Sequence, residues 1–132
     1  MRKILLVACC AVLLALTLGP VTAALAVDDV FQGTWTAIDS DGSNLTLTIQ
    51  GSGTGGRHAV RELDDSASVC GGAPASVQGW GTVDGDTMDV LWTLACQPGG
   101  NPFRGPVTEI FTYDPGSDTL TDSLGIVFHR AT

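Results

Sequence analysis

Apolar and polar side chains alternate along residues 31–49, on both sides of a short polar turn. The apolar positions are Phe31, Trp35 and Ala37 before the turn and Leu45, Leu47 and Ile49 after it. A period of two is typical of a β-strand with one buried and one exposed face. The segment between the two halves, DSDGSN, consists of residues that favour turns. The pattern therefore predicts an antiparallel hairpin.

The rest of the chain repeats this arrangement. The expected further strands are 58–63, 77–83, 87–96, 107–113, 119–121 and 124–130, and the expected loops are 51–56, 64–74 and 97–106. No window has the period of a useful amphipathic helix. About eight strands at short intervals favour an all-β fold, a small antiparallel up-and-down meander that closes into a barrel, with a sandwich as the alternative.

The first 26 residues have the features of a secretory signal peptide. Arg2 and Lys3 precede an apolar run of about 15 residues, and a small-residue cleavage site ends at Ala26. The run is shorter than the roughly 20 residues that span a bilayer, which weakens the alternative of an uncleaved anchor. Lipidation at Cys9 is a further alternative. We therefore expect a secreted protein, extracellular or periplasmic, with a signal peptide at 1–26 and a single β-barrel domain at 27–132.

Loss of the signal peptide leaves a strongly acidic chain. It has four Arg, no Lys and 14 Asp plus Glu, a formal charge of −10. Such a surface repels nucleic-acid phosphates and anionic lipid headgroups. We expect no nucleic-acid partner and no membrane binding after cleavage. The remaining candidates for a partner are a small molecule or an exported protein, and a monomer is the simplest oligomeric state.

The same cleavage leaves two cysteines, Cys70 and Cys96. An even pair in an oxidising compartment predicts one disulfide. In the chain-entropy picture, closing this loop contributes roughly 3 kcal/mol to the free energy of unfolding. A thiol metal or redox site is the alternative, but the pair lacks CxxC spacing and clustered histidines. We therefore expect neither a metal nor another cofactor.

Gly33-Thr-Trp35, early on the first strand, resembles the Gly-x-Trp signature of the calycin barrels, the lipocalins and avidins. In that group a basic side chain from the last strand often lies across the tryptophan, and the resemblance assigns this place to Arg130. It implies a small ligand-binding barrel. Bacterial metalloprotease inhibitors with an avidin-like barrel and one disulfide are similar in length, which makes inhibition of exported proteases an alternative function.

Three tryptophans are candidates for a ligand pocket, because an indole offers both contact area and a hydrogen-bond donor. Trp35 and Trp92 lie on apolar faces of their strands, so core filling is the competing interpretation. Trp80 shares its face with polar residues, and we expect it to be partly exposed. Phe103, in QPGGNPFRGP, is a candidate anchor for a protease. The candidate ligand-binding residues are therefore Trp80, Trp35, Arg130 and Phe103.

No catalytic motif is present. We expect His58 and His129 on strand surfaces, and a small hydrolase would need one of them within about 3 Å of a carboxylate or hydroxyl. The turn DSDGSN has the composition of a calcium loop but lacks the spacing of an EF-hand, so turn chemistry explains it. Asn44-Leu-Thr46 is a formal glycosylation acceptor.

These observations favour a secreted, disulfide-stapled binding module without catalytic activity. The sequence leaves its ligand open. The segments 64–74 and 97–106 are expected to be the longest loops, and loops on a rigid scaffold commonly carry binding residues. We therefore expect recognition through the loops or through one end of the barrel.

Overall fold

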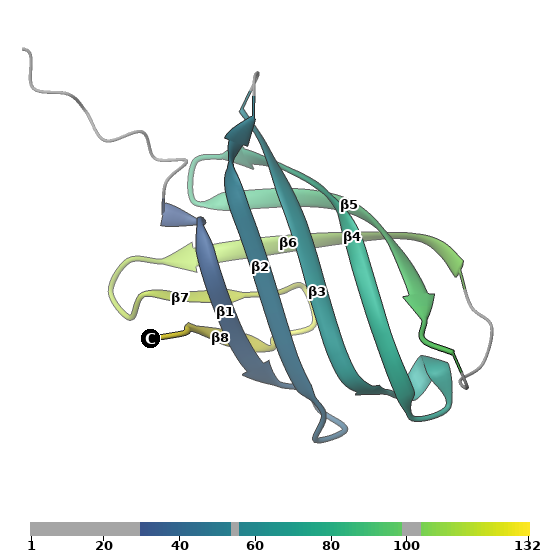
Figure 1. Ribbon diagram of the computed structural model, residues 1–132. Helices are drawn as coiled ribbons and strands as arrows, with labels where there is room; N and C mark the ends of the chain where they lie inside the picture. Colours follow the sequence, from purple (N-terminus) through teal and green to yellow (C-terminus); the bar gives the residue numbers. More distant parts are fainter. Residues whose placement is uncertain (1–29, 54–55, 99–103) are drawn as a thin grey trace, which may run out of the picture.

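The chain forms a closed eight-stranded antiparallel β-barrel (Figure 1). The computed structural model describes residues 30–53, 56–98 and 104–132. Its elements are β1 (Gly33–Ile38), β2 (Asn44–Gly53), β3 (Arg57–Ala67), the 3-10 helix η2 (Ser68–Cys70), β4 (Ala73–Asp84), β5 (Thr87–Cys96), β6 (Arg104–Asp114), β7 (Thr119–Thr121) and β8 (Val127–Arg130). Each strand pairs with the next in the chain, and β8 pairs back with β1. The predicted all-β meander and barrel are confirmed.

The register of the first hairpin carries through the barrel. Trp35 on β1 lies opposite Leu47 on β2, and Leu47 lies opposite Glu62 on β3. On β5 the alternate residues Met88, Val90 and Trp92 are buried, whereas Leu91 between them is 61% exposed. The period of two in the sequence therefore predicted correctly which face of these strands points inward.

Aromatic and aliphatic side chains from nearly every strand fill the barrel. The buried core consists of Phe31, Trp35, Ala37, Leu45, Leu47, Ile49, Val60, Val77, Met88, Val90, Trp92, Phe111, Leu120 and Phe128. Phe111 lies edge-on to both Trp92 and Phe128, with ring centroids 5.8 and 5.7 Å apart. An eight-stranded barrel is just wide enough for such a filling.

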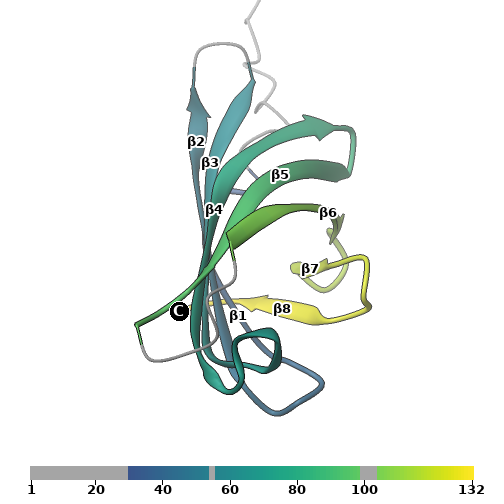
Figure 2. The ribbon, with the colours of Figure 1, turned by 90° about the vertical axis from the view of Figure 1, so that its right-hand side faces the viewer.

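The barrel closes through a short contact between its first and last strands. β1 pairs with β8 at two positions, Trp35 with Arg130 and Thr36 with His129. Figure 2 shows β8 beside β1, with β7 and β6 following round the wall. β7 has 3 residues and β8 has 4, whereas β3 and β6 have 11 each. The wall is therefore shortest along β7 and β8.

Several strand boundaries differ from those expected. Much of the segment 64–74 is strand, because β3 continues to Ala67 and β4 starts at Ala73. β6 begins at Arg104, inside the second expected loop, and β8 begins only at Val127. Backbone pairing in the ladder overrides the weak strand propensity of Asp, Ser, Gly and Pro. The expectation of two long recognition loops was therefore wrong for the first segment and for the end of the second.

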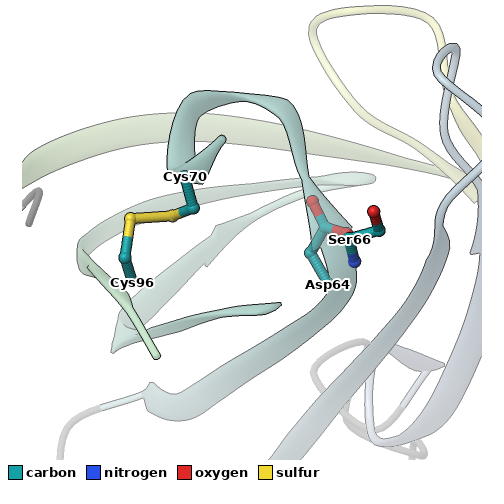
Figure 3. The surroundings of a disulfide bond; sticks show 4 residues. All are labelled: Asp64, Ser66, Cys70 and Cys96. Atoms are coloured by element: carbon teal, nitrogen blue, oxygen red, sulfur yellow. A yellow bond between two sulfur atoms is a disulfide. The ribbon is translucent and has the colours of Figure 1, made fainter. Parts of the chain in front are cut away.

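Cys70 and Cys96 form the expected disulfide, with Cα atoms 5.5 Å apart. Figure 3 shows the bond linking η2 to the end of β5. Gly71, directly after η2, has φ +68°, a left-handed conformation that favours glycine, and its N–H donates to the Ser68 carbonyl at 3.1 Å. The bond anchors η2 to the barrel wall and is consistent with an oxidising compartment.

Two sequence predictions lie outside the described residues. These are the signal peptide at 1–26 and the anchor residue Phe103. In the part of the chain that the structure describes, no helix has the length and apolar character needed to cross a membrane.

Candidate ligand-binding site

One end of the barrel, which we call the closed end, is sealed by Arg130 lying across Trp35. The guanidinium carbon is 4.0 Å from the centre of the indole ring, the arrangement that the calycin resemblance implied. Arg130 Nη1 donates to the Gln32 carbonyl at 2.7 Å, and Nη2 donates to the Val30 carbonyl at 2.9 Å. Gly33 has φ +133°, and a Cβ there would lie 2.9 Å from Arg130 Nη1. Glycine at this position therefore lets the arginine approach.

The polar groups around this pair find partners within the chain. The indole Nε1–H of Trp35 donates to the Phe31 carbonyl at 3.0 Å. Arg130 also holds Asp118 through two hydrogen bonds, of 2.9 and 3.0 Å, which lower the pKa of that carboxyl. Trp35 is fully buried. The structure thus brings the predicted residues Trp35 and Arg130 together, but in packing that leaves Trp35 no accessible surface.

A cavity of about 230 Å³ lies inside the barrel at the end that carries η2, which we call the open end. Its rim includes Val69 on η2 and Leu124 in the turn before β8, which are 48% and 80% exposed. Its apolar wall includes Leu45, Val77, Trp92, Leu94, Val107 and Phe111. Five carboxylates line the same space: Asp39, Glu62, Asp64, Glu109 and Asp122.

Strand alternation turns three of these carboxylates inward. On β3, Glu62 and Asp64 follow buried Val60 at successive inward positions. On β6, Glu109 precedes buried Phe111 by two residues and therefore shares its face. The other two carboxylates belong to the turns after β1 and β7. The open end is thus acidic because its strands place carboxylates where the closed end has apolar side chains.

Four of the five carboxylates accept hydrogen bonds from nearby groups. Asp39 accepts from the Ser40 hydroxyl and Asp64 from the Ser66 N–H. Glu109 accepts from the Ser123 N–H and Asp122 from the Ile126 N–H. Figure 3 shows Ser66 beside Asp64, whose Oδ1 accepts the Ser66 N–H at 2.9 Å. Such contacts stabilise the turns, and they account for these four carboxylates without any ligand.

Glu62 is different. It makes no hydrogen bond and no ion pair with any residue that the structure describes. Burial, together with the charges of Asp122, Asp64, Glu109 and Asp39, raises the pKa of this carboxyl to about 8. A carboxyl in this environment is largely protonated at neutral pH. Glu62 is therefore an unused hydrogen-bonding group on the wall of the cavity.

Trp92 is a second unused group on the same wall. Its side chain is 5% exposed and lines the cavity. Its indole Nε1 is buried and has no acceptor within the described chain. An unpaired buried N–H costs free energy, and such groups in native proteins commonly mark a site that a water or ligand completes. Core filling was the competing interpretation for Trp92, and the structure places the side chain both in the core and on the cavity wall.

Trp80 lies elsewhere, on the outer face of β4. It is 52% exposed, as the polar residues on its face predicted, and the Arg57 guanidinium carbon is 5.2 Å from its ring centre. A groove of about 600 Å³ runs beside it, past the exposed side chains of Leu91 and Ile110. This groove is larger than the cavity but lies on the outside of the wall. Trp80 therefore does not join Trp92 in one site.

The two histidines lie in different surroundings. The expectation of a surface position was wrong for His58, which is fully buried because residue 58 points inward, two positions before Val60. Neither of its ring nitrogens has a hydrogen-bond partner in the described chain. His129 is exposed, as expected. No carboxylate or hydroxyl of the described residues hydrogen-bonds to the His58 ring, and the hydrolase alternative stays a prediction.

The turn at 39–44 is explained by local hydrogen bonds. The Asp41 carboxylate accepts the Ser43 N–H at 3.0 Å, which lowers the pKa of Asp41, and Asn44 donates to Asp65 at 2.8 and 2.6 Å. Across residues 30–53, 56–98 and 104–132, no group of three or more His, Cys, Asp or Glu side chains is placed to hold a metal ion. The carboxylates of the open end are thus spread around its wall.

Sequence reasoning missed the residues that distinguish the open end. The available signal was a carboxylate on the apolar face of a strand, as at Glu62 after Val60 and at Glu109 before Phe111. Both segments were predicted as strands, 58–63 and 107–113, but neither carboxylate was singled out as facing the core. A charged residue in phase with core residues was the pattern that could have found the cavity.

Comparison with family models, with curated proteins and with solved structures found no significant match. The fold and the site therefore rest on the geometry described above.

Proposed function

We propose that the protein is an exported, calycin-like binding barrel that holds a small, partly apolar molecule in the cavity of its open end. The observation that carries this proposal is the cavity itself, about 230 Å³ inside the barrel with apolar walls and polar groups that lack partners. Concave, mainly apolar sites with a few convergent polar groups are typical of ligand pockets. The disulfide and the strongly acidic charge support export of a soluble binding module.

The calycin-like assignment is supported by the closed end. The Gly-x-Trp signature, the arginine of the last strand across the tryptophan and the eight-stranded meander occur together. In this arrangement one end is sealed by packing and the other remains available for a ligand. Of the two expected routes of recognition, through loops or through one end of the barrel, we therefore propose the open end.

The test compares two substitutions at neighbouring residues of β6. Val107→Phe adds volume inside the cavity, whereas Thr108→Phe adds the same ring on the exposed outer face. Three aromatic probes of similar shape but different charge are titrated by calorimetry: phenethylamine (cationic), phenylethanol (neutral) and phenylacetate (anionic). We expect at least one probe to bind the wild type and the Thr108 variant, and to bind Val107→Phe at least about tenfold more weakly.

Two results would contradict the proposal. One is that none of the three probes binds. The other is that the two phenylalanine variants bind equally well, because the cavity would then not be the site. A Trp80→Ala variant shows whether binding instead occurs in the outer groove, since it removes a side chain that lines this groove and leaves the cavity intact.

A further inference from the structure

We infer that the ligand of the open end carries a positive charge: an organic amine with a compact apolar body, whose ammonium group lies beside Glu62. This inference rests on the proposed function and specifies its ligand class. It is drawn from the charge, the hydrogen bonding and the size of the cavity.

The charged side chains that line the cavity are all acidic among the described residues. Five carboxylates face the cavity, and no Arg or Lys occurs among the described residues that line it. Like charges gathered in a partly buried space repel one another and lose hydration, so they are costly unless a cation compensates them. A bound ammonium group would supply the opposite charge that the chain itself does not provide there.

The hydrogen bonds point to one carboxyl among the five. Asp39, Asp64, Glu109 and Asp122 accept hydrogen bonds from nearby residues, whereas Glu62 accepts none within the described chain. An ammonium group needs hydrogen-bond acceptors, and Glu62 has free acceptor capacity inside the cavity. The ring of Trp92 on the same wall provides a surface on which a cation or an aromatic body can pack. Its unpaired N–H remains available to an acceptor on the ligand.

The size of the cavity restricts the ligand further. At about 30 Å³ for each water, 230 Å³ holds roughly eight waters, or an organic molecule of about ten non-hydrogen atoms. The apolar wall formed by side chains such as Val77, Leu94 and Phe111 suits a hydrocarbon or aromatic body. A compact monoamine matches both the volume and the mixed lining.

The protonation of Glu62 provides a second, independent measurement, the pH dependence of the affinity. The empty site favours the protonated carboxyl, under the influence of burial and of the carboxylates Asp122, Asp64, Glu109 and Asp39. Binding of an ammonium group favours the ionised form, so the proton leaves Glu62 for the solvent when the amine binds. Affinity for the amine should therefore rise as pH is raised toward 8, and this rise should vanish in Glu62→Gln.

The experiment ranks the three probes on the wild-type protein. We expect phenethylamine to bind at least about tenfold more tightly than phenylethanol, and phenylacetate to bind most weakly. Glu62→Gln should weaken phenethylamine by about tenfold and change phenylethanol by less than about twofold. Asp89→Asn is the matched control, because it removes a carboxylate from the exposed outer face of β5 and should leave both affinities unchanged.

The outcomes separate this inference from the proposed function. If phenylethanol binds as tightly as phenethylamine, or phenylacetate binds best, the cavity is a binding site but the cationic ligand class is wrong. If no probe binds, the proposed function itself fails. Calcium chloride alone is titrated in parallel, and calcium binding that depends on Glu62 and blocks the amine would overturn the assignment to an organic amine. The ranking of probes needs no variant, so it decides the question even if a variant does not fold.

Discussion

The two ends of the barrel share the same alternation of inward and outward side chains but differ in how their polar groups are bonded. At the closed end, Arg130, Trp35 and Asp118 form a set of hydrogen bonds and ring contacts, and the tryptophan is fully buried. At the open end, Glu62 and Trp92 face a cavity and have unused hydrogen-bonding groups. The contrast is therefore between Arg130, Trp35 and Asp118, which bond to one another or to nearby backbone, and Glu62 and Trp92, which have no such partner in the described chain.

This difference shows how a small barrel can combine stability with binding. A protein of this size has only a few kcal/mol of net stability, so unpaired polar groups are tolerated where the rest of the fold offsets them. The closed end and the disulfide supply that offset. If this division holds, substitutions at the closed end and at the disulfide should mainly change stability, and those of Glu62 and Trp92 should mainly change binding and the response to pH.

The largest effect is expected from Trp35→Ala, which removes a fully buried side chain at the closed end. The loss of packing should lower the free energy of unfolding by about 4 kcal/mol, measured by chemical denaturation. Trp80→Ala is the control, since that tryptophan is 52% exposed and should cost less than about 1 kcal/mol. Equal losses in the two variants would remove the basis for calling the closed end the stabilising one.

The disulfide should account for the next largest effect. Replacing both Cys70 and Cys96 by alanine should lower the free energy of unfolding by about 3 kcal/mol, because the unfolded chain regains the freedom of a long loop. Adding a reductant to the wild type should give a similar loss in the same denaturation experiment. If neither treatment lowers the midpoint of chemical denaturation, the stability of the protein does not depend on this disulfide.

Glu62 should make the stability of the open end depend on pH. Its folded pKa of about 8 lies above the ordinary value of 4.5, so the folded state keeps a proton that the unfolded state loses. Its contribution to stability is therefore complete below about pH 4.5 and is lost as pH rises through 8. The full difference corresponds to about 5 kcal/mol, and we expect roughly 2 kcal/mol because the site contacts solvent and can relax.

The variant Glu62→Gln isolates this effect. It should match the wild type near pH 5 and exceed its stability by roughly 2 kcal/mol near pH 9, because the glutamine has no charge to bury. Denaturant titrations at both pH values measure the difference. If the difference in free energy of unfolding between the wild type and the variant is the same at both pH values, Glu62 is not held in a buried, acidic environment.

The smallest effect is expected from Asp118→Asn at the closed end. Hydrogen bonds from Arg130 lower the pKa of Asp118 below the ordinary value of 3.8, so its stabilisation is present above that value and is lost as pH falls through the folded pKa. This partly exposed pair should contribute less than about 1 kcal/mol near neutral pH. The difference in free energy of unfolding between the variant and the wild type should disappear at acidic pH, which is the opposite of the trend at Glu62. A difference that persists at acidic pH would argue against the ion pair.

Much of the fold was accessible from the sequence because it depends on local signals. Alternation between Phe31 and Ile49, and again through β5, set the strand faces, and the turn residues set the hairpins. The disulfide followed from the two cysteines that lie beyond the predicted signal peptide. The resemblance placed Arg130 on Trp35 correctly, since a residue on the last strand of a closed barrel must lie beside the first.

The candidate site was less accessible, since it depends on how distant strands meet. Glu62 on β3 and Glu109 on β6 belong to one cavity only because the barrel closes, and neither position attracts notice alone. His58 was expected on the surface, although it lies two positions before Val60 and therefore shares the inward face of β3. Where partners lie far apart in the chain, period and composition give no direct signal.

The three tryptophans allow the most direct test of the central claim, that ligand enters the open end. Trp92 lines the cavity, Trp35 lies under Arg130 at the closed end, and Trp80 lies on the outer wall. In a ¹⁵N-labelled protein each indole N–H gives its own NMR signal, so a titration with phenethylamine reports on all three places at once. We expect the Trp92 signal to shift with ligand concentration while those of Trp35 and Trp80 stay in place. A shift at Trp80 or Trp35 with Trp92 unchanged would contradict the account.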